Sequence, residues 1–419
     1  MDETLGIYVH IPFCASKCGY CDFYSCPDSG QMMDKYQQAL LTHIRESLPQ
    51  IRRYYIDTVY IGGGTPSYYG ADRLCEILEE LKSSGRLLRN SEITVEMNPD
   101  SMRLNELKLL RKEGVNRISM GVQSANDDVL HIIGRRHTYG QAVKAYQLAR
   151  QAGFRNISVD LIYGLPGQTK GDWADTLGKI VGWGPEHISC YGLKLEEGTP
   201  MYEVYHDTNA LPDDDTQADM YQYASELLER YGYRRYEISN FARRGFSSQH
   251  NLKYWKLQDY MGFGPAAHSC VGDLRYSYVR DLQKYITGVL TGGTILDESE
   301  TITGIERANE YLMLGMRTAR GISAEEYTRQ FRAGFGPLEE KLEFFREQGW
   351  TRKENERWSF TTAGFLVSNV LIGELLDVQA QQNAVGTPYL QEVLEGLHRQ
   401  QLPMNEEQAF MQELFGTKS

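Results

Sequence analysis

Residues 8–26 read YVHIPFCASKCGYCDFYSC, and this stretch decides the fold. A short apolar run ends in three cysteines, Cys14, Cys18 and Cys21, spaced C-x₃-C-x₂-C. Cys26 follows five residues later, so four of the chain's seven cysteines fall within thirteen residues. Such a cluster indicates a disulfide scaffold, a zinc site, a redox pair or an iron–sulfur cluster.

The composition narrows these alternatives. The chain has 419 residues, 41% hydrophobic and 24% charged, which is typical of a globular protein longer than one ordinary domain. It has no apolar run long enough to span a membrane, and the N-terminus is acidic where a signal peptide is basic. We therefore expect a cytoplasmic protein, whose clustered thiols bind metal or do chemistry rather than form disulfides. The net charge of −12 argues against nucleic acid as a partner.

Outward from the cysteines, short apolar segments rich in β-formers alternate with amphipathic helical stretches. The expected strands are 6–13, 57–64, 92–99, 116–124, 156–166 and 187–195. The expected helices between them are 33–48, 71–84, 104–114, 139–153 and 172–183. This alternation predicts an α/β fold with a parallel sheet. Six βα units are two short of a complete eight-fold barrel, so we expect a partial (β/α)₆ barrel that is open along one side.

Polar residues follow or close these strands. They are the cysteine cluster, the glycine triplet with Thr65, Glu96, Gln123, Asp160 and Lys194. Working residues of parallel α/β folds lie at the carboxyl ends of the strands, so we expect one shared site there.

The last part of the chain changes character. Three helical stretches from residue 303, a hairpin over 350–360 and a helix over 361–376 are similar to a winged helix. The third helix is acid-rich, which favours a cap or a partner surface over DNA reading. We expect domains 1–300 (the barrel), 301–376 (helical, winged-helix-like) and a polar tail, 377–419. A strand is also expected over 233–242.

Three thiolates on one short loop can hold three corners of a 4Fe–4S cubane and leave the fourth iron without a protein ligand. Zinc would need a fourth ligand, and no second CxxC supplies one. The other four cysteines, Cys26, Cys75, Cys190 and Cys270, are expected to be small buried residues.

This spacing at the end of the first strand of a βα barrel resembles the radical S-adenosylmethionine (SAM) superfamily. The resemblance implies that the open iron chelates the amino and carboxylate groups of SAM, and that an electron from the cluster cleaves SAM to a 5′-deoxyadenosyl radical. Tyr20 would shield the cluster and lie against the adenine.

The segment GGGTPS (62–67) follows the second strand, and its exposed N–H groups are expected to bind the amino-acid end of SAM. With YVHIPFC, VEMNPD, GVQS and VDLIYGLPGQT it resembles the coproporphyrinogen oxidase-like branch of the superfamily. The SAM-binding residues that this implies are Tyr8, Tyr20, Gly63, Gly64, Thr65, Glu96, Gln123, Arg135 and Asp160. Carboxylates would offset the sulfonium and ammonium of SAM, and an arginine would pair with its carboxylate. In GRRHT, Arg136 competes with Arg135 for that role.

Two functions compete within this branch, oxygen-independent coproporphyrinogen III oxidase and the haem chaperone family HemW. The oxidases carry a further cysteine where this chain has Phe23, and a long arm where only seven residues precede Tyr8. HNLKYW (250–255) matches the HNxxYW signature of the chaperones. A chaperone is therefore the expected function, with the oxidase or another radical SAM tetrapyrrole enzyme as the alternative.

The chaperone resemblance also implies a cargo and partners. Haem would be bound by His250 as iron ligand, with Tyr254 and Trp255 packed against the macrocycle. His268 and Cys270 compete as iron ligands. The implied partners are acceptor haem proteins, respiratory and membrane-associated ones among them, and a second copy of the chain in a cluster-dependent homodimer.

Overall fold

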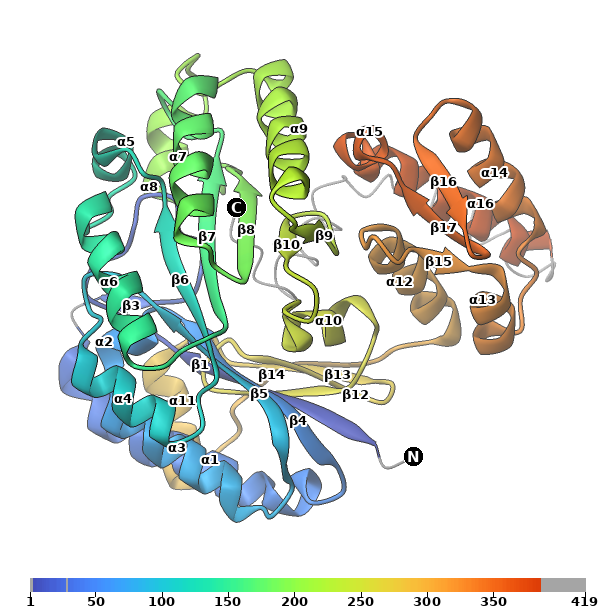
Figure 1. Cartoon of the computed structure of the whole chain (residues 1–419). Helices are drawn as coiled ribbons and strands as arrows, with labels where there is room; N and C mark the ends of the chain where they lie inside the picture. Colours follow the sequence, from blue (N-terminus) through green and yellow to red (C-terminus); the bar gives the residue numbers. More distant parts are fainter. Residues whose placement is uncertain (1–2, 28, 386–419) are drawn as a thin grey trace.

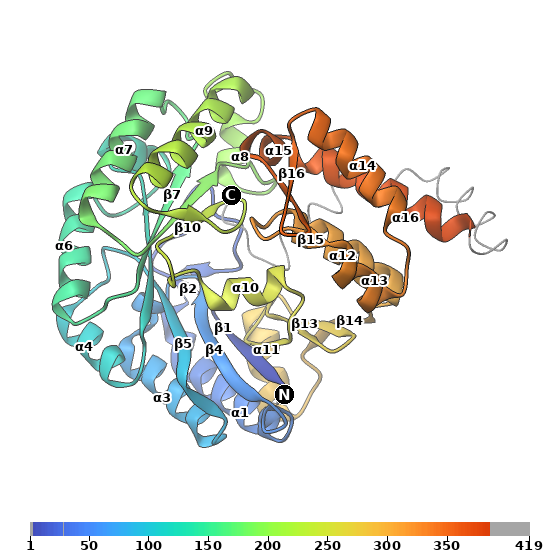
Figure 2. The ribbon, with the colours of Figure 1, turned by 45° about the vertical axis from the view of Figure 1, so that its right-hand side comes forward.

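The computed structural model describes residues 3–27 and 29–385, and its centre is a parallel sheet with helices on the outer face (Figures 1 and 2). The six expected strands form, in chain order, β1 (Thr4–Ile11), β4 (Tyr55–Gly63), β5 (Leu87–Met97), β6 (Arg117–Gln123), β7 (Ile157–Tyr163) and β8 (His187–Gly192). The expected helices are α1 (Met33–Ile51), α3 (Ala71–Ser83), α4 (Leu104–Lys112), α6 (Tyr139–Gln151) and α7 (Lys170–Trp183). The predicted α/β fold with six βα units is confirmed.

Local sequence explains these elements. Every residue of β6 is buried, as expected for a parallel strand covered on both faces. Thr138 and Thr169 begin α6 and α7 with capping boxes, each side chain accepting a bond from the third helical N–H. The buried faces of the helices and strands form one continuous hydrophobic core.

The sheet extends past both edges of the six predicted strands. Next to β1 lies a seventh parallel strand, β11 (Tyr260–Phe263), followed by antiparallel β12 (His268–Val271), β13 (Leu274–Tyr278) and β14 (Leu296–Thr301). Next to β8 lie antiparallel β10 (Asn240–Ala242) and β9 (Arg234–Arg235). The expected single strand over 233–242 is therefore wrong, because residues 236–239 leave the ladder. These added strands therefore cover the edges of β1 and β8.

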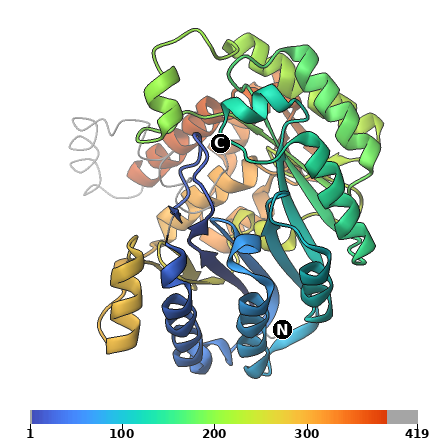
Figure 3. The same cartoon turned by 90° about the vertical axis from the view of Figure 1, so that its left-hand side faces the viewer.

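Short segments at the end of the barrel where these strands finish are β2 (Phe13–Cys14), β3 (Cys26–Pro27), the 3₁₀ turn Gly30–Met32, α2 (Pro66–Tyr69), α5 (Asp127–Ile132) and α8 (Pro200–Tyr205). Elsewhere, α9 (Asp214–Arg230) packs against α7, α10 (Gln249–Trp255) contacts β4 and α11 (Leu282–Thr291) packs against α1. In Figure 3 the dark-blue loop that follows β1 rises to the end of the barrel opposite the N-terminus.

The C-terminal part has its own hydrophobic cluster. Helices α12 (Gly304–Met316), α13 (Ala324–Phe331) and α14 (Gly336–Glu347) precede the hairpin β16 (Thr351–Glu354) and β17 (Arg357–Phe360), as expected. A strand that was not expected, β15 (Ile322–Ser323), pairs with β17. The helix expected over 361–376 is instead two helices, α15 (Thr362–Leu366) and α16 (Ser368–Val385). The rest of the predicted tail, from 386, lies outside the described residues.

This part packs beside the barrel next to α9 and α10 (Figure 1). A backbone hydrogen bond of 3.0 Å from Ala319 N–H to Tyr236 C=O joins the two. Within the described residues, no helix has the length and apolarity needed to cross a membrane.

Candidate cofactor and ligand site

The three cysteines of the motif border one small cavity of about 60 Å³ at the carboxyl end of the sheet. Cys14 ends β2, and Cys18 and Cys21 lie on the loop that follows; all three are free thiols. The loop is fixed by bonds from Gly19 N–H to Ile133 C=O (3.2 Å) and from Met201 N–H to Gly19 C=O (2.8 Å). Loops around α5 and α8 therefore set the position of the thiols.

The surroundings of the thiols disfavour the negatively charged thiolate form unless a cation binds. Burial raises the pKa of Cys21 to about 12 and also raises the pKa of Cys14. Thr65 Oγ1 lies 3.3 Å from Cys14 Sγ, and Arg135 Nη1 donates to Cys18 Sγ at 3.6 Å. Binding of a metal cluster must therefore release protons from at least Cys14 and Cys21.

Among the described residues, no three His, Cys, Asp or Glu side chains converge as ligands of a single metal ion would. A cubane cluster takes one thiolate per iron, so its ligands stand farther apart, and three thiols around one cavity fit that pattern.

The glycine segment is built differently from the expectation. Gly63 has φ +108°, and a Cβ on Gly64 would lie 2.7 Å from the carbonyl oxygen of Phe13, so both positions favour glycine. The N–H groups expected to bind a ligand are already used. Gly63 donates to Glu96 (3.2 Å), Gly64 to the carbonyl of Ile11 (2.7 Å) and Thr65 to that of Phe13 (2.7 Å).

Two other groups bordering this cavity have unpaired atoms. Gln123 stands in the left-handed region at φ +67°, and its Oε1 is buried without a hydrogen-bond partner. Arg135 donates to Gly121 C=O and to Asn98, but its buried Nε has no partner. Buried polar atoms are almost always paired in native proteins, so an unpaired acceptor and an unpaired donor indicate a ligand. An ammonium and a carboxylate, the amino-acid end of SAM, fit them.

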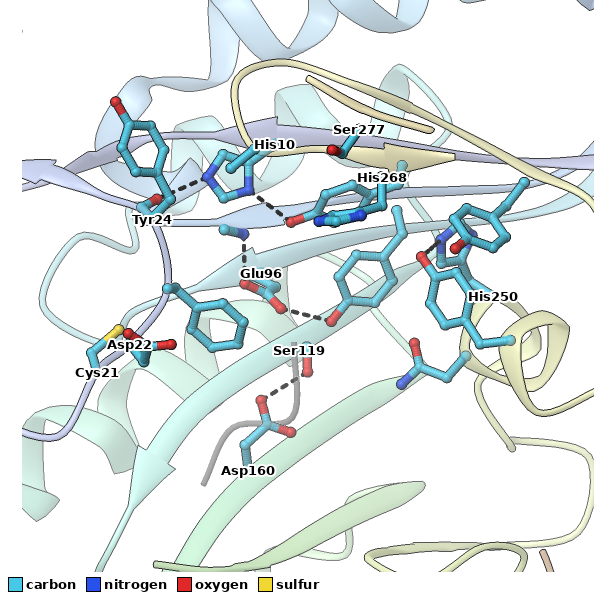
Figure 4. A pocket seen from close by; sticks show the side chains of 18 of the residues that line it. His10, Cys21, Asp22, Tyr24, Glu96, Ser119, Asp160, His250, His268 and Ser277 are labelled. Atoms are coloured by element: carbon cyan, nitrogen blue, oxygen red, sulfur yellow. Dashed lines mark hydrogen bonds between the residues drawn. The ribbon is translucent and has the colours of Figure 1, made fainter. Parts of the chain in front are cut away.

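A second, larger cavity of about 370 Å³ adjoins the first, and we call it the mouth cavity (Figure 4). Tyr20, Cys21, Gly63 and Glu96 border both. Glu96 accepts from Tyr60 Oη at 2.8 Å, which holds its carboxylate between the two spaces.

Asp160 and Tyr8, expected beside SAM, line the mouth cavity and not the small cavity. Asp160 accepts from Ser119 (2.9 Å), Ser158 (3.2 Å) and Ser189 (2.7 Å), so its carboxylate is fixed on the cavity floor.

Aromatic rings form one wall of the mouth cavity. Tyr8 and Tyr60 stack with centroids 6.3 Å apart, and Tyr60 and His250 stack at 5.3 Å with 28° between their planes. Tyr254 meets His250 edge-on at 5.2 Å. A wall built of aromatic rings suits a ligand with an extended apolar body.

Four histidines line this cavity, and three of them have both ring nitrogens hydrogen-bonded. His10 bonds Tyr8 (2.9 Å) and the carbonyl of Tyr24 (2.8 Å). His187 bonds Ser158 (2.7 Å) and Tyr236 (2.8 Å). His250, with no exposed surface, bonds Thr58 and Tyr254, both at 2.8 Å. Burial, with Lys253 and Arg117 nearby, lowers the pKa of His250 to about 3.

The fourth histidine, His268, is partly exposed at the start of β12. No hydrogen bond joins either of its ring nitrogens to another described residue. Burial lowers its pKa as well, so the imidazole is neutral near pH 7. A neutral imidazole with free nitrogens is the form that ligates iron.

The remaining expected residues are dispersed. Trp255 lies on the other side of α10 from the mouth cavity, in a cleft of about 900 Å³ between α10 and the C-terminal part, which we call the basic cleft. The cations that line it are Arg234, Arg235, Arg243, Arg244, Lys256, Arg320, Arg329 and Arg357. Cys270, Arg136 and Lys194 border neither the small cavity nor the mouth cavity.

Sequence reasoning missed Arg117 and Asn251, both of which line the mouth cavity. Arg117 was counted within an apolar strand. The signal in the sequence is an arginine inside an otherwise apolar strand segment, where a charged side chain is uncommon unless it is paired.

Comparisons with known proteins identify the family of the chain. Residues 8–180 match the model of the radical SAM superfamily, and residues 302–367 match the HemN C-terminal domain. The heme chaperone HemW of Bacillus subtilis is 34% identical over 375 residues, covering 88% of this chain and 98% of the relative. HemW of Escherichia coli is 31% identical, covering 88% and 97%. The mitochondrial radical S-adenosyl methionine domain-containing protein 1 of Bos taurus is 32% identical, covering 89% and 88%.

Among solved structures, the coproporphyrinogen III oxidase HemN of Escherichia coli superposes with a TM-score of 0.77. It is 23% identical, and the match covers 90% of each chain. This likeness shows a shared fold, a radical SAM barrel followed by a C-terminal domain.

Proposed function

The chain belongs to the HemW family of radical SAM proteins, and on that premise we propose that it is a haem chaperone that binds haem in the mouth cavity and passes it to acceptor haem proteins. Membership of the superfamily implies a 4Fe–4S cluster and SAM. Cys14, Cys18 and Cys21 would hold three irons, and Gln123 and Arg135 would hold the amino-acid end of SAM.

Bound there, the cluster and SAM supply an electron source and a labile sulfonium. The chain's own residues link that space to the mouth cavity. Tyr20 and Glu96 border both, so their side chains respond to the occupancy of either. This contact supports a regulatory use of cluster and SAM, in which their state controls haem release.

The observation that carries the haem site is the combination of ring wall and free imidazole in one cavity. Iron reaching His250 would have to displace Thr58 or Tyr254 from a ring with no exposed surface. His268 needs no such exchange. We therefore assign the iron ligand to His268, and to His250 the role of positioning Tyr60 and Tyr254 in the wall.

The test is an anaerobic haem titration of cluster-loaded protein followed by absorption and EPR spectroscopy. Wild type and His250→Gln should give the same ligated-haem spectrum, although His250→Gln should bind more weakly. His268→Ala should change the spectrum, whereas His206→Ala, on the surface, should not. A His268→Ala spectrum identical to wild type, with the signal lost in His250→Gln, would return the ligand role to His250.

The function itself is tested by transfer. Haem-loaded protein, with its cluster, should restore absorption to a haem-depleted acceptor such as an apo-cytochrome b, and gel filtration should show a dimer only in cluster-loaded protein. If wild-type protein does not bind haem, the proposed chaperone function is rejected. Decarboxylation of coproporphyrinogen III in the presence of SAM and reductant would establish the oxidase instead.

A further inference from the structure

A guanidinium with two unpaired nitrogens lines the mouth cavity. Arg117, at the start of β6, is 1% exposed. Its Nε and Nη1 are buried without a partner, and no carboxylate of the described residues lies within ion-pair distance of it. Leaving a buried charge unpaired is among the costliest arrangements in a folded protein.

The carboxylates nearest to Arg117 are engaged elsewhere. Glu92 accepts the backbone N–H of His250 at 3.1 Å, and Asp160 accepts from three serines. They contribute an attractive field that keeps Arg117 charged, but no hydrogen bond. The donors on Nε and Nη1 thus find no acceptor among the described residues, although arginines in protein interiors normally use them.

We propose that Arg117 binds a carboxylate of the ligand that occupies the mouth cavity, and that this carboxylate is a propionate of haem. The planar fork of arginine matches a carboxylate with two parallel bonds. The proposal rests on the proposed function for the identity of the ligand. It adds the residue that orients the macrocycle, because a propionate on the floor leaves the opposite edge toward the opening.

One other source of a carboxylate is SAM. Arg135 borders the small cavity with its own unpaired Nε, whereas Arg117 borders the mouth cavity alone. Each arginine therefore serves a different space, and the propionate is favoured for Arg117.

The test compares haem with haem dimethyl ester, which has the same macrocycle and iron but no free carboxylate. A charge-assisted bond is worth about 1.5–3 kcal/mol, so wild type should bind haem about ten- to a hundredfold more tightly than the ester. Arg117→Gln should remove most of that preference, and Arg117→Lys, which keeps the charge, should retain part of it. Arg155→Gln, an exposed arginine outside both cavities, should behave as wild type.

Three outcomes would overturn the assignment. An unchanged preference in Arg117→Gln would exclude a propionate contact. Arg280 is an exposed arginine that also lines the mouth cavity, and loss of the preference in Arg280→Gln instead would move the contact to the rim. A fall in SAM affinity in Arg117→Gln, measured by calorimetry on cluster-loaded protein, with the haem preference intact, would assign the carboxylate to SAM.

Folding is checked by circular dichroism and by iron content, and Arg117→Lys provides a second variant should Arg117→Gln unfold. If wild-type protein does not bind haem, the proposed function is rejected. The SAM measurement still reports on the role of Arg117, so failure of the proposed function can be distinguished from failure of the Arg117 assignment.

Discussion

Single residues in the two cavities differ in how completely their polar atoms are paired. Asp160 and His250 are fully engaged by neighbouring side chains, which fixes them in place before any ligand arrives. Gln123, Arg135 and Arg117 retain unpaired atoms. The paired residues shape the cavities, and the unpaired ones are where ligands are expected to bind.

At this scale, the adjacent arginines Arg135 and Arg136 give a matched comparison. Arg135 contacts Cys18, Asn98 and Gly121, whereas Arg136 is exposed and lies 3.6 Å from Asp100. Arg135→Gln should lower SAM affinity about tenfold, because one charge-assisted bond is lost. Arg136→Gln should change it less than twofold. Calorimetry on cluster-loaded protein measures both, and equal effects would contradict the assignment.

The sequence predicted most residues around the cysteines, because spacing and strand ends identify them without coordinates. It did not separate the two cavities. Whether Tyr8 or Asp160 faces one space or the other depends on strand twist and register. The sequence also could not predict that the backbone N–H groups of residues 63–65 are already hydrogen-bonded. Their acceptors belong to Ile11, Phe13 and Glu96, which come from other strands.

For whole elements, the six predicted βα units were found, while β11 and β15 were missed. The tetrapeptide YMGF of β11 is too short for a periodic pattern, and only its pairing with β1 makes it a strand. β15 has two residues and exists through its ladder with β17. Elements defined by tertiary partners are the ones that local pattern does not predict.

The turn before β15 gives a prediction about this element. Gly321 has φ +65°, and a Cβ there would lie 1.8 Å from the carbonyl oxygen of Trp358. Gly321→Ala should lower the free energy of unfolding by about 2–4 kcal/mol, since backbone must shift. Gly304→Ala, with open space around its Cβ, should change it by less than about 0.5 kcal/mol. Urea denaturation followed by tryptophan fluorescence compares the two, and similar losses would contradict the packing described.

For the whole molecule, buried neutral histidines set the response to acid. Burial lowers the pKa of His43 to about 4 and of His137 to about 3, and lowers that of His187 well below its usual 6.5. Between those values and 6.5 the unfolded chain binds protons that the folded chain does not, so stability rises with pH there and is lost as pH falls.

Each such ring should reduce the free energy of unfolding by up to about 1.4 kcal/mol per pH unit as the pH falls below 6. Urea denaturation at several pH values between 7.5 and 5 measures the slope. His43→Gln should make it shallower by up to about 1.4 kcal/mol per pH unit, and His206→Gln, whose ring is exposed, should leave it unchanged. A slope that is flat between pH 6.5 and 5 would show that these rings are protonated in the fold.

The helix α10 stands between the mouth cavity and the basic cleft, with His250 and Tyr254 on one side and Trp255 on the other. It has only seven residues, so Trp255 lies within two helical turns of both rings. A ligand or partner that displaced Trp255 would therefore also displace His250 and Tyr254, which stand on the same short helix. A substitution at Trp255 that weakens haem binding would therefore not show that Trp255 contacts haem. The same result would arise if occupancy of the basic cleft altered the wall of the mouth cavity through α10.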